Sequence, residues 1–220
     1  MSGGCPAAGS WFRSVLSPLH AILDVDAAAA AGWQPLDLAR AFVDGGATFI
    51  QVRAKRLASG PLLDLCDAVV RLAQARGATI IVNDRVDLAK MSGAAGVHVG
   101  QEDLPPAAAR ALLGGEAIVG FSTHTVAQIE AALTEPVSYV AVGPVFGTRT
   151  KDTGYDPVGL DLIARAVSVA AGRPVVAIGG ITVDNAASVL AAGATQVAVI
   201  SDLLAADPAA RVRAYLERLR

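Results

Sequence analysis

Eight copies of one pattern run through this chain: a short apolar segment rich in Val and Ile, a polar or glycine-containing turn, and a longer stretch rich in Ala and Leu. Short apolar segments bounded by turns are typical of buried strands, and longer amphipathic stretches are typical of helices. Strict alternation of the two predicts parallel strands joined by right-handed crossovers, and eight such units predict an α/β fold, a single (β/α)8 TIM barrel. The expected strands are LHAILDV (19–25), TFIQVRA (48–54), TIIVND (79–84), GVHVG (96–100), AIVGFST (117–123), YVAVGPV (139–145), PVVAIGG (174–180) and QVAVIS (196–201).

An open, doubly wound sheet is the competing fold for alternating strands and helices. Such a sheet usually carries a glycine-rich phosphate-binding turn after its first strand. The turn after the first expected strand is DVDAAAAAG (24–32), which is not a phosphate-binding fingerprint. The barrel is therefore the expected architecture.

Composition limits the classes of partner. The chain has 220 residues, is 53% hydrophobic and carries a net charge of −2. These values are typical of a soluble globular protein with one core, and they provide neither a field that attracts nucleic acid nor a basic face for a membrane. The expected partners are small-molecule substrates, with no nucleic acid and no membrane, and homo-oligomerisation is left open.

The first residues differ from the repeating pattern. We expect residues 1–16 to form a partly ordered N-terminal extension and residues 17–220 to form the barrel catalytic domain. The opening MSGGCPAAGSWF lacks the charged-then-apolar order of a signal peptide. The two cysteines, Cys5 and Cys66, have no metal-binding spacing, so a reducing, cytoplasmic location is expected.

Charged and amide side chains follow the second, third and fourth strands. Active sites of (β/α)8 barrels lie at the carboxyl ends of the strands. Alternation places Gln51, Arg53 and Lys55 on one face of the second strand, where they predict either an anion cradle or a salt-bridge layer with Asp84 or Asp103. Because Mg²⁺ is usually held by one or two carboxylates plus substrate phosphates, Asp84 and Asp103 are the candidate metal ligands. Asp103 is also a candidate helix N-cap.

The later strands end in phosphate-binding residue types. Hydroxyl and ammonium donors suited to phosphate oxygens gather in the loop GTRTK (147–151). The loops after the seventh and eighth strands are the usual phosphate site of this fold, where glycine lets backbone N–H groups approach an anion. The glycines could equally form a tight turn into the next helix. The candidates are Thr148, Thr150, Lys151, Gly179, Gly180, Ile200 and Ser201.

Three histidines divide into two groups. His124 follows the fifth strand beside Ser122, and its role stays open between structure and acid–base chemistry. His20 and His98 lie within apolar strands, where we expect core positions with satisfied hydrogen bonds.

Taken together, these segments resemble the thiamine-phosphate synthase family. The matching motifs are QVRAK, VNDRVDLA, GVHVGQEDLP, GFSTH, GPVFGTRTK, VAIGGI and VAVIS, which cover residues 17 to about 215 in the order of the family. The resemblance implies a transferase that couples 4-amino-2-methyl-5-(diphosphomethyl)pyrimidine to a thiazole phosphate. The products would be thiamine phosphate and diphosphate, formed through a dissociative pyrimidine methyl cation path with Mg²⁺ as cofactor.

The resemblance also implies roles for individual residues. The catalytic set would be Arg53, Lys55, Ser122 and Lys151. With Gln51 and Asn83, these residues would contact the pyrimidine diphosphate, and Asp84 and Asp103 would hold magnesium. The thiazole phosphate would be bound by Thr148, Arg149, Thr150, Gly180, Ile200 and Ser201.

Three departures from the family pattern are present: the leader of residues 1–16, position 54, where an altered support contact is expected, and the first strand, which leaves a further function open. Ala54 stands where the family usually has Glu, and LHAILDVD replaces the usual first strand Tyr-Leu-Val-Thr-Asp. That opening leans toward the related thiazole tautomerases, which use a histidine at a place compatible with His124 and handle a single phosphate. The joint presence of Asp84, Asp103 and Lys151 favours the synthase. A non-catalytic phosphate-binding barrel and a Schiff-base aldolase using Lys55 or Lys151 also stay open.

Overall fold

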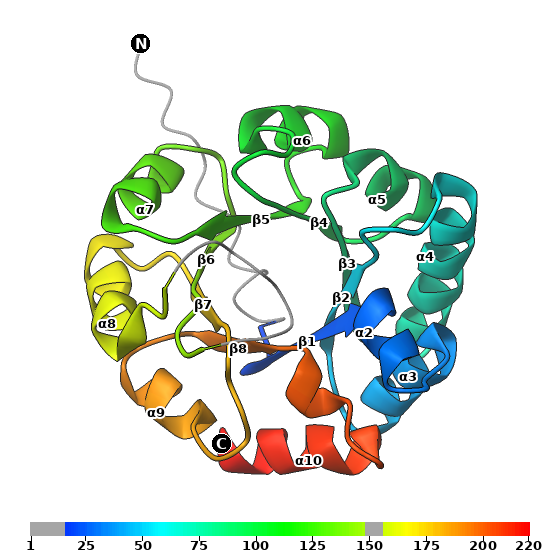
Figure 1. Cartoon of the computed structure of the whole chain (residues 1–220). Coiled ribbons are helices and arrows are strands. Elements are labelled where there is room, and N and C mark those ends of the chain that lie inside the picture. The colour runs from blue at the N-terminus through cyan, green and yellow to red at the C-terminus, as the bar shows by residue number, and fades with distance from the viewer. Residues whose placement is uncertain (1–15, 148–155) are drawn as a thin grey trace.

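The computed structural model describes residues 16–147 and 156–220, which form a closed barrel of parallel strands (Figure 1). Each strand pairs with its neighbour in sequence, and β8 pairs with β1 to close the ring. The predicted (β/α)8 barrel is therefore confirmed. The strands are β1 (Leu19–Asp24), β2 (Phe49–Arg53), β3 (Thr79–Asn83), β4 (Gly96–Val99), β5 (Ile118–Thr123), β6 (Tyr139–Val142), β7 (Val175–Ile178) and β8 (Gln196–Val199).

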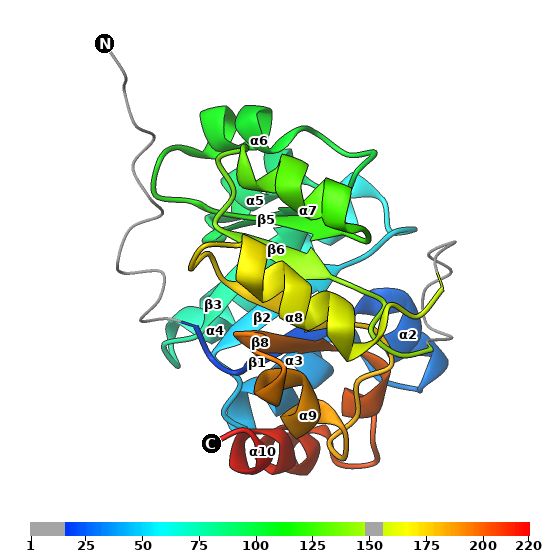
Figure 2. The same cartoon turned by 90° about the vertical axis from the view of Figure 1, so that its left-hand side faces the viewer.

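Helices surround the barrel on its outside, as Figures 1 and 2 show from two directions. A short additional helix, α2 (Val25–Ala30), directly follows β1 and is capped by the Asp24 carboxylate, which accepts a hydrogen bond from the Ala27 N–H at 2.9 Å. The others are α3 (Pro35–Asp44), α4 (Ser59–Gln74), α5 (Val86–Ser92), α6 (Pro106–Leu113), α7 (Val126–Leu133), α8 (Gly159–Val169), α9 (Ala186–Ala191) and α10 (Pro208–Arg218), with a 3-10 turn η1 (Ser201–Leu203) after β8.

Several strands are shorter than predicted at their carboxyl ends. The expected strand 174–180 ends at Ile178 because Gly179 and Gly180 adopt φ angles of 105° and 63°, which are incompatible with a strand. The expected strand 139–145 ends at Val142, before Gly143 and Pro144. These terminal residues form loops over the carboxyl end of the barrel. The predicted division at residue 16 stays a prediction, since residues 1–15 lie outside the described part of the chain.

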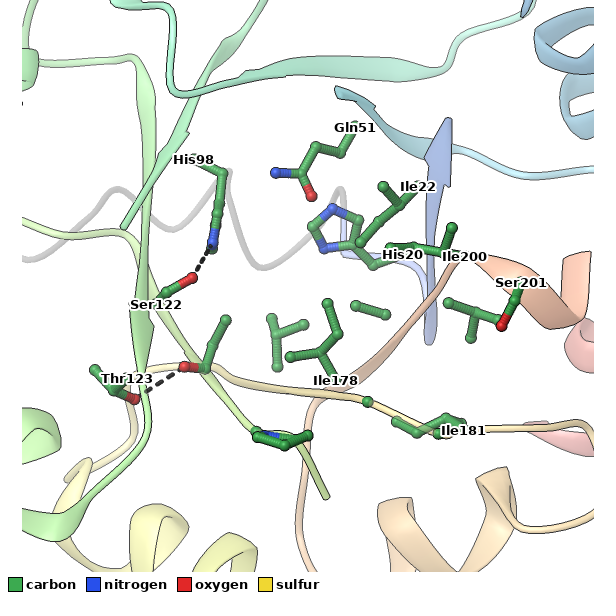
Figure 3. A pocket seen from close by; sticks show the side chains of 18 of the residues that line it. His20, Ile22, Gln51, His98, Ser122, Thr123, Ile178, Ile181, Ile200 and Ser201 are labelled. Atoms are coloured by element: carbon green, nitrogen blue, oxygen red, sulfur yellow. Dashed lines mark hydrogen bonds between the residues drawn. The ribbon is translucent and has the colours of Figure 1, made fainter. Parts of the chain in front are cut away.

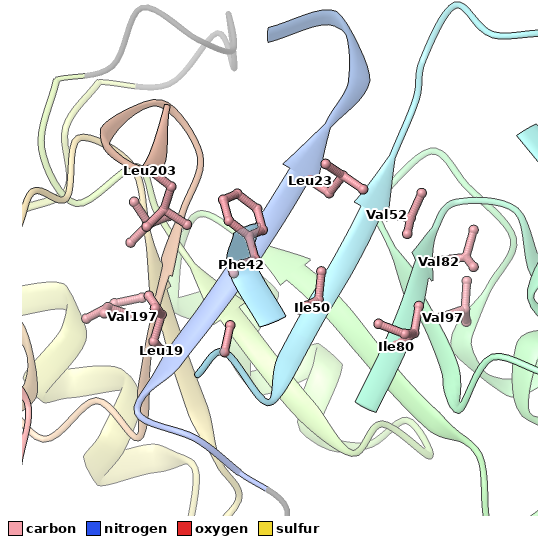
Figure 4. Close-up of a cluster of buried hydrophobic side chains, with 14 of the residues drawn as sticks. Leu19, Leu23, Phe42, Ile50, Val52, Ile80, Val82, Val97, Val197 and Leu203 are labelled. Atoms are coloured by element: carbon pink, nitrogen blue, oxygen red, sulfur yellow. The ribbon is translucent and has the colours of Figure 1, made fainter. Parts of the chain in front are cut away.

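Alternation along each strand divides the buried residues into two cores. Side chains on the outer face, including Leu23, Ile50 and Val82, pack against the helices (Figure 4). Side chains on the inner face fill the barrel itself, among them Phe49, Ile81, Ile118, Tyr139 and Val176. The inner core is small, so polar residues share the barrel interior with it.

Gly120 on β5 makes room for two of these interior rings. The Tyr139 and His98 rings stack with centroids 5.6 Å apart. A Cβ atom at position 120 would lie 2.1 Å from Tyr139 Cζ and 2.6 Å from His98 Nδ1. Real Cβ atoms do not approach other atoms so closely, so glycine is required here by packing.

We therefore expect Gly120→Ala to destabilise the barrel by about 1–3 kcal/mol or more, because the added methyl displaces both rings from their packed positions. Denaturant unfolding would measure the loss. Gly60→Ala is the matched control, since no atom lies within 4 Å of a Cβ built there. Alanine favours the helix at that site, so the control should be neutral or slightly stabilising. Equal stability of the two variants would contradict the packing argument.

Candidate active site

A pocket opens among the carboxyl-end residues of the strands and encloses about 780 Å³ of space, counting the part open to solvent (Figure 3). One part of its lining is formed by polar side chains, namely His20, Gln51, His98, Ser122 and His124. The other part is apolar or backbone, from Pro144, Ile178, Gly179, Gly180, Ile200 and Ser201. The predicted residues Gln51, Ser122, Gly180, Ile200 and Ser201 are thus brought together.

The polar part of the pocket is held together by hydrogen bonds between amide, imidazole and hydroxyl groups. Gln51 Nε2 donates to Asn83 Oδ1 at 3.0 Å. The His98 ring joins two hydroxyls, with Nδ1 2.8 Å from the Tyr139 oxygen and Nε2 2.8 Å from Ser122 Oγ. Burial raises the pKa of Tyr139 well above its ordinary value, so its hydroxyl stays protonated. This region therefore offers hydrogen-bonding amide, imidazole and hydroxyl groups to a polar ring.

Arg53 has a partner that was not predicted from the sequence. Its guanidinium forms an ion pair with Asp24, which lies directly opposite on the neighbouring strand β1. The expected partners were Asp84 or Asp103, and for Arg53 that expectation is wrong. The parallel register of β1 with β2 places Asp24 opposite Arg53. In the sequence, the only signal for this pair was a carboxylate near the end of the first expected strand.

Lys55 and the two predicted metal ligands form a second cluster of charges. Lys55 Nζ lies 2.5 Å from Asp84 Oδ2, which matches one of the predicted pairs. Asp84 adopts a left-handed backbone conformation with φ of 62°. Asp103 accepts a hydrogen bond from the Gly100 N–H at 2.7 Å and from the Asp84 carboxyl. The predicted residues of strands 2 to 4 thus converge.

Protonation of the two carboxyl groups is linked. Burial raises the pKa of Asp84, Lys55 opposes that shift, and Asp103 adds to it. Burial raises the pKa of Asp103, but the hydrogen bonds from Asp84 and from the Gly100 backbone together lower it by more. The pKa of Asp103 therefore lies below its ordinary value. Two acidic groups this close repel when both are ionised, and a cation between them would relieve the repulsion.

The loops after β7 and β8 are fixed by contacts between them. Asp202 Oδ2 accepts hydrogen bonds from the Val183 N–H at 3.1 Å and from the Tyr215 hydroxyl at 2.7 Å. Asn185 Nδ2 donates to the Gly180 carbonyl at 3.1 Å. A Cβ atom on Gly180 would lie 2.5 Å from the Gly147 carbonyl oxygen, so glycine is needed for the close approach of the β6 and β7 loops. Asp202, Asn185 and Tyr215 were not identified from the sequence, because nothing local marks them.

Four predicted residues cannot be placed. Thr148, Arg149, Thr150 and Lys151 lie outside the described residues. Their predicted phosphate contacts stay predictions.

The three histidines behave differently from one another. His98 is buried and hydrogen-bonded, which confirms the expectation for it. His124 lines the pocket, with Nδ1 2.6 Å from the Gly143 carbonyl oxygen. For His20 the expectation of a satisfied ring was wrong: within the described part of the chain, neither ring nitrogen has a hydrogen-bond partner.

The fold and the pocket define a (β/α)8-barrel enzyme with a small-molecule site at the carboxyl ends of its strands. A family model described as thiamine monophosphate synthase matches residues 21–203. The chain belongs to this family, and it is a transferase of thiamine biosynthesis.

Individual relatives agree with this assignment. The thiamine-phosphate synthase of Moorella thermoacetica is 46% identical over 187 residues, which cover 84% of this chain and 89% of that protein. A thiamine biosynthesis bifunctional protein of Symbiobacterium thermophilum is 46% identical over 191 residues, 86% of this chain, and the match spans 40% of its length. The solved structure of thiamine phosphate pyrophosphorylase from Pyrococcus furiosus superposes with a TM-score of 0.85 at 30% identity, covering 94% of this chain and 97% of that one.

The family is consistent with a requirement for a metal cofactor. Among residues 16–147 and 156–220, no helix is both long and apolar enough to cross a membrane.

The ion pair of Asp24 and Arg53 gives a testable prediction. The two side chains are 3% and 14% exposed, respectively, so removing the carboxylate charge leaves a poorly solvated guanidinium. Asp24→Asn, which keeps a side chain able to cap α2, should lower the free energy of unfolding by about 3–5 kcal/mol. Denaturant unfolding would measure it.

The control for this prediction is Asp37→Asn. Asp37 pairs with Arg40 on the surface, where the side chains are 60% and 54% exposed, so its loss should change stability by less than about 1 kcal/mol. A loss at Asp24 no larger than the loss at Asp37 would show that burial does not strengthen the inner pair.

Proposed function

We propose that this chain couples 4-amino-2-methyl-5-(diphosphomethyl)pyrimidine to a thiazole phosphate, giving thiamine phosphate and diphosphate. The observation that carries the proposal is the juxtaposition of a polar pocket with the cluster of Lys55, Asp84 and Asp103, which the hydrogen bond from Gln51 to Asn83, the neighbour of Asp84, connects. An uncharged ring joined to a diphosphate needs both regions side by side. The relatives named thiamine-phosphate synthase support the same reaction.

The pyrimidine ring would occupy the polar part of the pocket, which Gln51 and Ser122 line. Gln51, oriented by its hydrogen bond to Asn83, presents a carboxamide to that space, and Ser122 is oriented by His98. Amide and hydroxyl groups can match the donors and acceptors of an aminopyrimidine without introducing charge. In this assignment Gln51, Asn83 and Ser122 bind and orient the ring.

The diphosphate would lie toward the charged cluster. Lys55 supplies a compact positive charge, and Lys151 would add a second. Arg53 contacts Asp24 through Nη1, and a guanidinium has five N–H donors, so it can hold Asp24 and contact a phosphate oxygen together. These groups neutralise the charge that grows on the leaving diphosphate.

Asp84 and Asp103 fit a divalent cation. Their carboxyl groups are neighbours, and burial together with the nearby Asp103 carboxyl raises the pKa of Asp84, so a cation bound between them would relieve their repulsion. Mg²⁺ is usually held by one or two carboxylates together with substrate phosphates. Bound there, Mg²⁺ would supply positive charge to the diphosphate oxygens.

The thiazole phosphate would bind at the loops after β6, β7 and β8. Gly180, Ile200 and Ser201 line the pocket on that side, and Gly180 keeps its backbone accessible because it carries no side chain. Thr148, Arg149 and Thr150 would complete this phosphate site.

The chemistry then needs few proton transfers. The bond between the pyrimidine methylene carbon and the diphosphate oxygen breaks, and both electrons leave with diphosphate. The thiazole nitrogen donates its lone pair to the resulting cation and becomes positively charged, as in thiamine. The main task of the chain is to align the two rings and exclude water from the cation.

The direct test is to combine both substrates, Mg²⁺ and purified protein and to measure thiamine phosphate and diphosphate by chromatography. Formation of both products in equal amounts is the expected result. Binding of both substrates without product would support a non-catalytic barrel instead. We also propose a cytoplasmic enzyme acting on small molecules, consistent with the free, buried thiol of Cys66.

The proposed metal ligands predict a loss of turnover. Asp84→Asn keeps a residue that tolerates the left-handed backbone, and Asp103→Asn keeps similar size. Each variant should lower kcat by roughly 30- to 1000-fold, because charge stabilisation of the leaving group is lost. Steady-state kinetics with varied Mg²⁺ would measure the effect.

Asp87→Asn is the matched control for these variants. It removes an exposed carboxylate that pairs with Arg85 on the surface, three residues from Asp84. It should keep wild-type kcat and Mg²⁺ dependence. Full activity of Asp84→Asn and Asp103→Asn in the presence of a chelator would overturn the metal assignment.

His124 separates the synthase from the second candidate, a thiazole phosphate tautomerase. Its position in the pocket lining is the observation that favours the tautomerase. If the chain is a synthase, the cation path needs no strong base, so His124→Ala should retain substantial coupling activity. Coupling rates and metal-free thiazole isomerisation would be measured on the same protein. Metal-free isomerisation that disappears in His124→Ala would identify a tautomerase.

A further inference from the structure

The ring of His20 is buried in the barrel, and its nitrogens have no hydrogen-bond partner among the residues that the structure describes. The residue is 1% exposed. The ring lines the pocket, where it lies beside the Gln51 carboxamide and faces His98 across the open space (Figure 3). Native proteins pair the large majority of their buried polar atoms, so two unpaired nitrogens on one ring need an explanation.

Packing does not explain a histidine at this position. The ring meets Phe49 edge-on with centroids 4.8 Å apart, and Tyr139 similarly at 6.1 Å. An apolar ring could make the same contacts without two unsatisfied nitrogens. The imidazole therefore reduces the stability of the ligand-free barrel, which points to a role when the pocket is filled.

The protonation state of the His20 ring determines which ligand groups it can bind. Burial, reinforced by nearby His98, lowers the pKa of His20 to about 3, and the Gln51 amide opposes part of that shift without the geometry of a hydrogen bond. His20 is thus neutral near pH 7. A neutral imidazole offers one N–H donor and one acceptor nitrogen, which suits a ligand edge that carries both kinds of group.

We propose that His20 is a specificity-determining residue that hydrogen-bonds the nitrogen-bearing edge of the substrate's pyrimidine ring. The inference rests on the function proposed above and adds a residue to it. His20 belongs to the pyrimidine side because it lies next to Gln51, while the glycine loops line the other side of the pocket. A ring that lacks these polar groups would leave both His20 and Gln51 unpaired and would be rejected.

Stability gives the first test. His20→Phe removes the unpaired nitrogens and keeps an aromatic ring, so the ligand-free variant should have a Tm about 2–4 °C above that of the wild type. His20→Leu serves as a second variant in case the larger ring does not fit. A lower Tm for both variants would show that the imidazole supports the fold, and the proposal would be overturned.

Kinetics gives the second test. His20→Phe should raise KM for the pyrimidine diphosphate about 10- to 100-fold, equivalent to about 1.4–2.8 kcal/mol, and leave KM for the thiazole phosphate within about twofold. His20→Asn, which keeps a donor and an acceptor, should recover part of the loss. Phe49→Leu is the matched control, because it changes packing against the same ring without removing a hydrogen-bonding group. Equal increases in both KM values, or none, would overturn the proposal.

Nitrogen NMR gives a third test that is independent of turnover. The chain has three histidines, so imidazole ¹⁵N signals can be assigned by comparison with His20→Phe. Addition of the hydroxymethyl analogue of the pyrimidine, which lacks the diphosphate, should shift both His20 nitrogens. If coupling is normal but these signals do not move, the role of His20 fails and the proposed function stands. If the wild type forms no thiamine phosphate, the proposed function fails and the inference fails with it.

Discussion

The alternation of side chains along eight short strands is the constraint on which the rest of this structure depends. In a closed barrel, every second residue of each strand points to the axis, and the others point to the helices. The outward residues are apolar and form a continuous layer beneath the helices. On β2 the inward residues change from apolar to polar toward the carboxyl end, from Phe49 through Gln51 to Arg53. The pocket is the place where these polar ends meet.

Charged side chains at the carboxyl ends of the strands pair with side chains of opposite charge. Asp24 has two roles, because one carboxylate oxygen caps helix α2 and the other accepts a hydrogen bond from Arg53. Asp84 likewise lies between Lys55 and Asp103. In the polar part of the pocket, by contrast, burial lowers the pKa of His20 to about 3 and raises that of Tyr139, so both of these side chains are neutral near pH 7. The charged cluster of Lys55, Asp84 and Asp103 is not part of the pocket lining, and the Gln51–Asn83 hydrogen bond links the pocket to the strand end that carries Asp84.

Two positions in the barrel interior depart from ordinary core residues. Gly120 has no side chain, which leaves space for the stacked rings of His98 and Tyr139. The two ring nitrogens of His20, which lines the pocket, have no hydrogen-bond partner within the described part of the chain. Local departures from ideal packing of this kind are expected at functional sites, because a ligand and not the fold completes them.

The sequence by itself determined the barrel, the order of its strands and which polar residues gather at the strand ends. Strand and helix periods are local properties, and the polar residues at strand ends must converge once parallel strands close into a ring. For that reason Gln51, Asn83, Asp84, Asp103 and Ser122 could be predicted to lie near one another. Tertiary structure alone decided which groups pair. The register of β1 against β2 brings Asp24 to Arg53, and the link from Tyr215 to Asp202 joins α10 to the loop after β8. The unpaired state of His20 depends on what surrounds its ring from β2 and β4, and those neighbours are distant in the chain.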